Sequence, residues 1–140
     1  MRAAKRSREE GTKIMKIALR IVLALGGLLL LYLGFGFLTD PVAAGAGFGL
    51  SVEGAHATTS VRSDFTAFFG VSGAAFIWGA WKQHGEALVF GAALMLVTLA
   101  ARLVSLSIDG SFEGFHVPMI VELVLGIGGL VGAKILPEKA

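Results

Sequence analysis

Residues 17–38 read IALRIVLALGGLLLLYLGFGFL and decide the fold class, because no charged residue occurs between Ile21 and Leu38. At about 1.5 Å per residue, such a helix is roughly 33 Å long and crosses a hydrocarbon core of about 30 Å. The apolar run is longer than the 7–15 residues or so that are typical of a signal-peptide core. The sequence therefore predicts an uncleaved transmembrane helix here.

Composition extends this prediction to the whole chain. Of 140 residues, 55% are hydrophobic and 16% are charged, and the mean hydropathy is +0.78. A soluble domain has about a quarter of its residues charged and could not bury so much apolar surface. Three further apolar segments predict spans at 62–81, 87–106 and 117–136. Short connectors between them favour antiparallel neighbours. We therefore expect an all-α, four-helix up-down transmembrane bundle over residues 14–136.

The segments outside the spans are expected to be irregular. Residues 1–13 predict a disordered basic tail, 39–61 an outer loop, and 137–140 a second tail. Asp40 and Pro41 suit the N-cap and first position of a short helical turn inside that loop.

Basic residues predict the orientation. Seven of the twelve Lys and Arg precede residue 21, and three more (Lys82, Lys134 and Lys139) fall on the same side of the expected membrane. The two outer loops contain neither residue type. Because basic loops stay in the cytoplasm, both termini are predicted to be cytoplasmic. Trp78 and Trp81 fall where an interfacial aromatic belt is expected.

Polar residues near the outer ends of the spans require an explanation, because a charge near the bilayer centre costs roughly 2.5–3.5 kcal/mol on insertion scales. Arg102 shares one face of its helix with Thr98, and we expect it to pair with Glu122 or Asp64. Residues from all four helices are predicted to converge on one polar layer in the outer leaflet. The candidate site residues are Tyr32, Arg62, Asp64, Thr98, Arg102, Asp109, His116 and Glu122.

Two interpretations of this layer stay open. It is either a structural ion-pair network that sets helix register, or the floor of an outward-opening pocket for a lipid or small amphiphile. A proton relay through Asp64 and Glu122 is disfavoured, since neighbouring Arg residues favour the charged form of a carboxyl.

Glycine is abundant, at 20 residues, and small faces let helix backbones approach closely. Packing within the chain is expected, with a homodimer through the last span, which carries a GxxxG pair, as the alternative. The candidate packing positions are Gly27, Gly34, Gly70, Gly91, Gly126, Gly128, Gly129 and Gly132.

Several classes of function are disfavoured. There is no cysteine, which excludes disulfides and thiol chemistry. The three histidines lack the spacing for haem or metal, so no cofactor or metal is expected. The basic N-terminal run lacks aromatic residues, which argues against nucleic-acid binding.

Several short motifs are similar to one known family. They are Asp40-Pro41, then Arg62-Ser63-Asp64-Phe65 with Gly70, then Ala101-Arg102-Leu103-Val104-Ser105 leading to Asp109-Gly110, and finally Glu122. Over residues 14–136 the chain resembles the bacterial membrane family catalogued as domain of unknown function 4345. It departs from that family's pattern at Phe69 and Ala101, where glycine is expected. The resemblance implies a four-helix inner-membrane protein and supplies no activity.

Three functions remain as hypotheses. The first is a binding or accessory protein that holds an amphiphile in the outer polar layer. The second is a small transporter or channel subunit, or a structural subunit of a membrane complex. The third, less favoured, is an enzyme of lipid or quinone chemistry.

Overall fold

The computed structural model describes residues 2–137, with side chains from residue 6 onward, and every regular element in that range is a helix. The helices are α1 (Arg2–Thr39), α2 (Pro41–Ala46), α3 (Gly54–Lys82), α4 (Gly85–Ile108) and α5 (His116–Ile135). The all-α prediction is confirmed for these residues. Of the predicted tail 137–140, residues 138–140 lie outside the described part of the chain.

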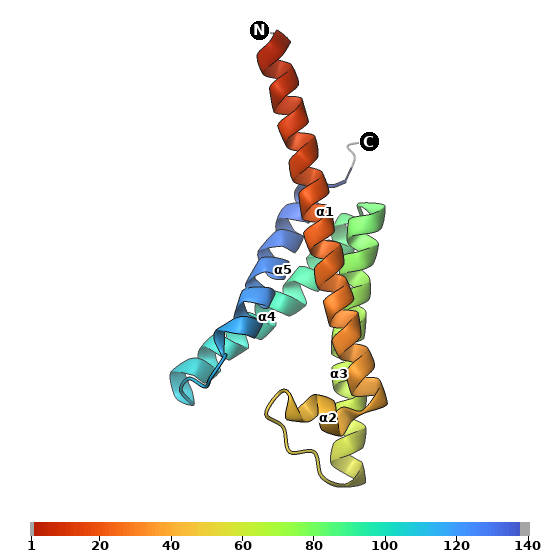
Figure 1. The fold of residues 1–140 in the computed structure, drawn as a ribbon, viewed down its shortest axis with the longest axis vertical. Helices are drawn as coiled ribbons and strands as arrows, with labels where there is room; N and C mark the ends of the chain where they lie inside the picture. The colour runs from red at the N-terminus through yellow and green to blue at the C-terminus, as the bar shows by residue number, and fades with distance from the viewer. Residues whose placement is uncertain (1, 138–140) are drawn as a thin grey trace.

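The four long helices form two antiparallel pairs. α1 packs along α3 and α4 packs along α5, and the two pairs meet at one end and diverge toward the other (Figure 1). We call these ends the narrow end, where α3 turns into α4, and the wide end, which holds α2 and the α4–α5 loop. The four long helices alternate in direction and form two splayed arms, where the sequence analysis expected a four-helix up-down transmembrane bundle.

The narrow end is held together by one aromatic side chain and the small residues around it. Phe76 of α3 is fully buried. A Cβ on Gly91 of α4 would lie 3.1 Å from its ring, and one on Gly129 of α5 would lie 3.0 Å away. Leu88 and Leu23, also fully buried, fill the space beside it. Protein interiors pack as densely as organic crystals, so the fit of these side chains against the two glycines determines where the two arms join.

Within the first arm, α1 and α3 approach through glycines. A Cβ on Gly73 would lie 2.6 Å from the Gly27 carbonyl oxygen, and one on Gly34 would lie 3.1 Å from the Gly70 nitrogen. Backbones this close exclude any larger residue at the contact. Gly73 was not among the predicted packing positions. Gly70 was, but nothing lies within 4 Å of where its Cβ would be.

The glycines of α5 face other helices of the same chain. A Cβ on Gly126 would clash with Leu96 of α4, and one on Gly132 would lie 2.9 Å from Leu23 of α1. The Gly128 position also faces Leu23, at an ordinary contact distance of 3.5 Å. The GxxxG face is therefore occupied by α1, which removes the reason for expecting a homodimer through this helix.

The N-terminal segment differs from its prediction. Residues from Arg2 onward are helical and continue directly into the first span, so the expectation of a disordered tail over 1–13 is wrong for the described residues. Two side-chain interactions support these turns: Arg6 pairs with Glu10 at 3.4 Å, and Thr12 donates to the Arg8 carbonyl. Pairs at this spacing favour helix, and Ala, Arg, Lys and Glu are good helix formers.

The predicted outer loop 39–61 is also more ordered than expected. Asp40 caps α2 by accepting a hydrogen bond from the Ala43 amide at 3.0 Å, with Pro41 at the first helical position, as predicted. α3 begins at Gly54, well before the predicted start at 62. Within this extra length of helix, the Thr58 and Ser63 hydroxyls each donate to a backbone carbonyl one turn earlier, those of Gly54 and Thr59.

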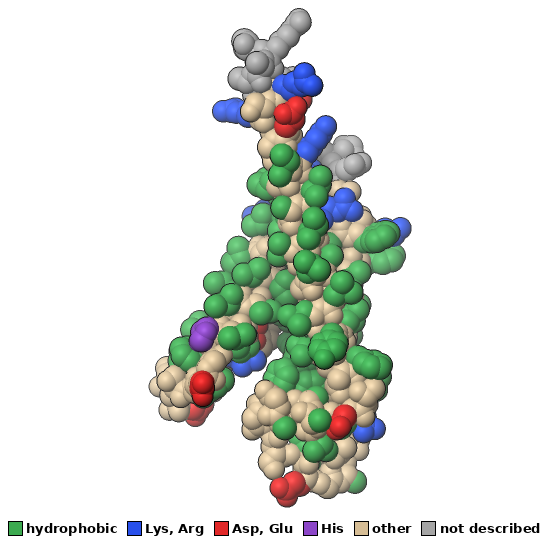
Figure 2. All heavy atoms as spheres, viewed as in Figure 1, with side chains coloured by type: hydrophobic (Ala, Val, Ile, Leu, Met, Phe, Trp, Pro, Cys, Tyr) green, Lys and Arg blue, Asp and Glu red, His purple; other side chains and the backbone are tan. Residues whose placement is uncertain are grey.

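Three helices among the described residues are long and apolar enough to cross a membrane: Arg6–Thr39, Gly85–Ile108 and His116–Ile135. α3 is long enough but is not among them; its first half carries His56, Arg62 and Asp64, and its second half is rich in Gly, Ala and Trp. Hydrophobic side chains cover much of the visible surface along the helices, while charged ones gather mainly toward the ends of the molecule (Figure 2). Such a surface is compatible with a membrane protein.

Candidate functional site

The candidate site centres on an ion pair between the last two helices. Nε of Arg102 in α4 donates to Oε1 of Glu122 in α5 at 2.6 Å. The Glu122 side chain is 8% exposed and that of Arg102 is 31% exposed. Thr98 lies one turn before Arg102 on the same face of α4, and its hydroxyl donates to the Leu94 carbonyl at 2.8 Å. The structure thus selects Glu122 from the two partners proposed for Arg102.

The ion pair forms part of the wall of a large cavity between the arms. The cavity has a volume of about 680 Å³, and the space between the two arms is visible as a notch in Figure 2. Its first-arm wall is apolar, with Leu30 and Leu33 of α1 and Phe69 of α3. Its second-arm wall carries Arg102 and Glu122. One charged pair therefore faces an otherwise mainly hydrophobic space.

The rim of the cavity comes from the loops at the wide end. Phe48, in the turn after α2, packs on the fully buried Phe37, with ring centroids 5.2 Å apart. The Gly49 backbone in the same turn has φ 73°, a conformation that glycine adopts without strain. Across the opening, Phe112 and Glu113 of the α4–α5 loop line the same cavity. The turn was not predicted as part of the site, because its contact with the cavity depends on how α2 folds back.

Glu122 has one oxygen without a partner. Oε1 accepts from Arg102, whereas Oε2 is buried and has no hydrogen-bond partner among the residues that the structure describes. Buried polar atoms are nearly always satisfied, so this oxygen is an exception among the described residues. Arg102 also retains donors, since the described residues give its guanidinium only the bond to Glu122.

A second cavity of about 410 Å³ adjoins the first. Thr98, Arg102 and Phe112 line both cavities, so the guanidinium stands between them. Asp109 lines the second cavity and accepts a hydrogen bond from Ser105. Of the described residues, the two cavity walls include the carboxylates of Asp109, Glu113 and Glu122 and one basic side chain, Arg102.

The other predicted members of the polar layer do not join this pair. Tyr32 is 73% exposed on the outer face of α1. Arg62 and Asp64 are exposed on α3, and His116 is exposed at the start of α5; none of the four lines the cavities. The predicted convergence of all four helices is wrong in this structure. Depth along the helices placed these residues at one level, but the arms diverge at that level.

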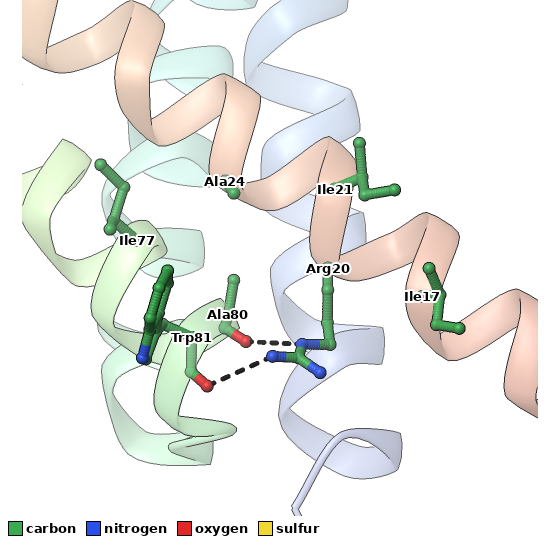
Figure 3. Close-up of a pocket in the computed structure, with 7 residues that line it drawn as sticks. All are labelled: Ile17, Arg20, Ile21, Ala24, Ile77, Ala80 and Trp81. Carbon is green, nitrogen blue, oxygen red and sulfur yellow. Dashed lines mark hydrogen bonds between the residues drawn. The ribbon is translucent and has the colours of Figure 1, made fainter.

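A polar contact that the sequence analysis missed joins the helices of the first arm. Arg20 of α1 reaches the end of α3, where its Nε donates to the Ala80 carbonyl at 3.0 Å and a terminal nitrogen to the Trp81 carbonyl at 3.4 Å (Figure 3). The last carbonyls of a helix lack partners and carry partial negative charge, so a guanidinium there is favourable. The signal was an Arg inside a predicted span, which requires a polar partner.

Comparisons with known proteins assign the chain to a family but do not indicate an activity. No match was found among curated proteins or solved structures. Within the described residues, no group of three His, Asp or Glu side chains could hold a metal ion. One family matches over residues 18–133, and its description is a domain of unknown function. This match covers most of the chain, including Arg102 and Glu122, so the chain belongs to the family of the domain of unknown function 4345.

Proposed function

We propose that this chain is a multi-pass membrane protein that binds a lipid or small amphiphile in the cavity between its two arms. One observation carries the proposal: a large, mainly apolar space is walled on one side by the ion pair of Arg102 and the buried Glu122. Ligand pockets typically combine an apolar lining with a few polar groups that fix orientation.

The charge distribution supports an orientation for this cavity. Seven of the twelve basic residues lie before residue 21, and Lys82, Lys134 and Lys139 lie at or beyond the ends of the predicted spans that face the same side. The connectors at the wide end carry Asp40, Glu53, Asp109 and Glu113 and no Lys or Arg. Under the positive-inside rule, all four long helices cross the inner membrane, both termini are cytoplasmic, and the cavity opens in the outer leaflet.

The shape of the cavity favours an amphiphile over a water-soluble ligand. Leu33, Phe69 and Met95 would surround an alkyl tail, while Arg102 and Glu122 would face a polar head. Each buried methylene contributes about 0.8 kcal/mol, so even a medium-length tail supplies useful affinity. The splayed arms would let such a ligand enter sideways from the bilayer.

Gentle extraction followed by native mass spectrometry tests the proposal. The wild-type chain should retain a bound amphiphile. Leu33→Trp, which fills the cavity from α1, should remove it. Leu28→Trp is the matched control, because it makes the same substitution on the same helix at a position that is 55% exposed and does not line the cavity.

Retention of the same ligand by both variants would contradict the proposal, as would a wild-type chain that binds no amphiphile when a series of lipids is added back. Folding of each variant is checked by its far-UV circular dichroism and its elution volume in detergent.

A further inference from the structure

We propose that the groove between α1 and α3 at the narrow end is a site for an anionic phospholipid, whose phosphate binds to Arg20. The groove has a volume of about 230 Å³. Its lining consists of Arg20, Trp81 and apolar side chains of the two helices (Figure 3). It shares no lining residue with the large cavity between the arms, so this inference does not depend on a ligand in that cavity.

The first argument is the arrangement of the Arg20 guanidinium. Its Nε and Nη2 donate to the Ala80 and Trp81 carbonyls at 3.0 and 3.4 Å, which holds the guanidinium against the end of α3. Nη1 makes no hydrogen bond to a described residue and is not among the buried atoms. In Figure 3 the third nitrogen points away from the two carbonyls. Arg20 is therefore fixed in place with donors to spare, and a phosphate oxygen is a preferred acceptor for a guanidinium.

The second argument is the position of the groove at a boundary between charged and apolar helix. Arg20 is the last charged residue of α1 before the uncharged run 21–38. Beyond this boundary, Ala24 of α1 and Ile77 of α3 line the apolar part of the groove. Trp81 is 73% exposed at its edge, and tryptophan is enriched at the level of lipid headgroups. A phospholipid has the same order of charged head and apolar chains. The site therefore suits a lipid of the leaflet at the narrow end, which is the cytoplasmic leaflet in the proposed orientation.

The third argument is the charge around the groove. Lys13 and Lys16 lie seven and four residues before Arg20, so the three side chains share one face of α1. Lys82 adds a positive charge in the last turn of α3. Among the residues that the structure describes, no acidic side chain lines the groove; Glu86, in the first turn of α4, is not part of its wall. Basic clusters next to a membrane span attract anionic lipids.

The test titrates the unchanged chain, in neutral detergent, with dioleoyl phosphatidylglycerol and with dioleoyl phosphatidylcholine. The two lipids have the same chains and a phosphate, and they differ in the net charge of the head. Native mass spectrometry measures the bound fraction against concentration. Phosphatidylglycerol should bind about tenfold more tightly, because its net negative charge is attracted by the basic side chains at the groove.

Matched substitutions show whether the preference comes from Arg20. Arg20→Met should abolish it, because the phosphate loses its fixed donor. Arg8→Met makes the same change in charge on the same helix, three turns earlier, at an exposed position that does not line the groove. This variant should keep most of the preference.

A second pair of variants blocks the groove without changing any charge. Ala24→Leu fills the groove from α1 and should weaken the binding of phosphatidylglycerol about tenfold. Ala18→Leu is its control, because Ala18 is exposed and does not line the groove. This pair locates the lipid even where Arg20→Met fails to fold.

Equal affinity of the unchanged chain for the two lipids would overturn the inference. Equal effects of Arg20→Met and Arg8→Met would also overturn it, because they would show attraction to the basic helix as a whole. Leu33→Trp separates this site from the cavity between the arms. A lipid in the groove should stay bound in Leu33→Trp and be lost in Ala24→Leu, whereas the opposite pattern would overturn the inference and support the proposed function.

Discussion

Arg102 and Glu122 lie on consecutive helices and share a hydrogen-bonded ion pair of 2.6 Å, with Glu122 far more buried than its partner. The asymmetry has an energetic consequence. Removing the arginine leaves a buried charge without compensation, whereas removing both charges does not. Arg102→Met should therefore destabilise the chain by about 2 kcal/mol, and Arg102→Met combined with Glu122→Gln should recover most of that loss.

Thermal unfolding in detergent measures this cycle. Additive losses in the double variant would mean that the pair is not coupled, and would also remove the polar wall from the proposed site. Asp64→Asn is a suitable control, because that carboxylate is exposed on the other arm and should have little effect.

The close contact of α1 with α3 gives a second prediction. Gly73→Ala should destabilise the protein by about 1–3 kcal/mol, because its Cβ would lie 2.6 Å from the rigid backbone oxygen of Gly27. Gly70→Ala, one turn earlier on the same helix, should be neutral or stabilise by up to about 1 kcal/mol through helix propensity.

These two variants are compared by their midpoints of thermal unfolding. Gly73→Ala should lower the midpoint, whereas Gly70→Ala should leave it unchanged or raise it. Equal effects would show that α1 and α3 are not in backbone contact at Gly27.

The Arg20 contact with α3 gives a third prediction. Arg20→Met keeps much of the stem but loses the bonds to the Ala80 and Trp81 carbonyls, and should cost about 1–2 kcal/mol of stability. Lys13→Met, two turns earlier and exposed, should cost little. If both variants unfold at the wild-type temperature, the guanidinium does not support the end of α3.

Membrane topology provides a fourth prediction, which matters most for α3 because the other three long helices are apolar enough to cross a membrane and α3 does not meet that standard. The chain has no cysteine, so a single introduced cysteine is the only residue of the chain that a maleimide can label. A maleimide that cannot cross membranes should label Ser51→Cys and Ser111→Cys in intact spheroplasts, and Glu86→Cys only after lysis. Labelling of Ser51→Cys and Glu86→Cys from the same side would show that α3 does not cross.

Some of the site was accessible to sequence analysis. The sequence predicts Glu122 as one of two partners for Arg102, because rise per residue puts these side chains at similar depth. The same reasoning failed for Tyr32 and Asp64. Depth along a helix says nothing about rotation or lateral distance, and these depend on contacts between helices that are remote in the chain.

The sequence by itself determined the properties that local composition controls: apolar helices of sufficient length, the cap at Asp40, and the segregation of basic residues. Only the tertiary structure decided that the helices form two diverging arms, that Gly73 meets Gly27, and that Oε2 of Glu122 lacks a partner. Burial, cavity shape and unpaired atoms depend on how side chains from distant segments fit together. That fit is a property of the packed chain, and no local pattern encodes it.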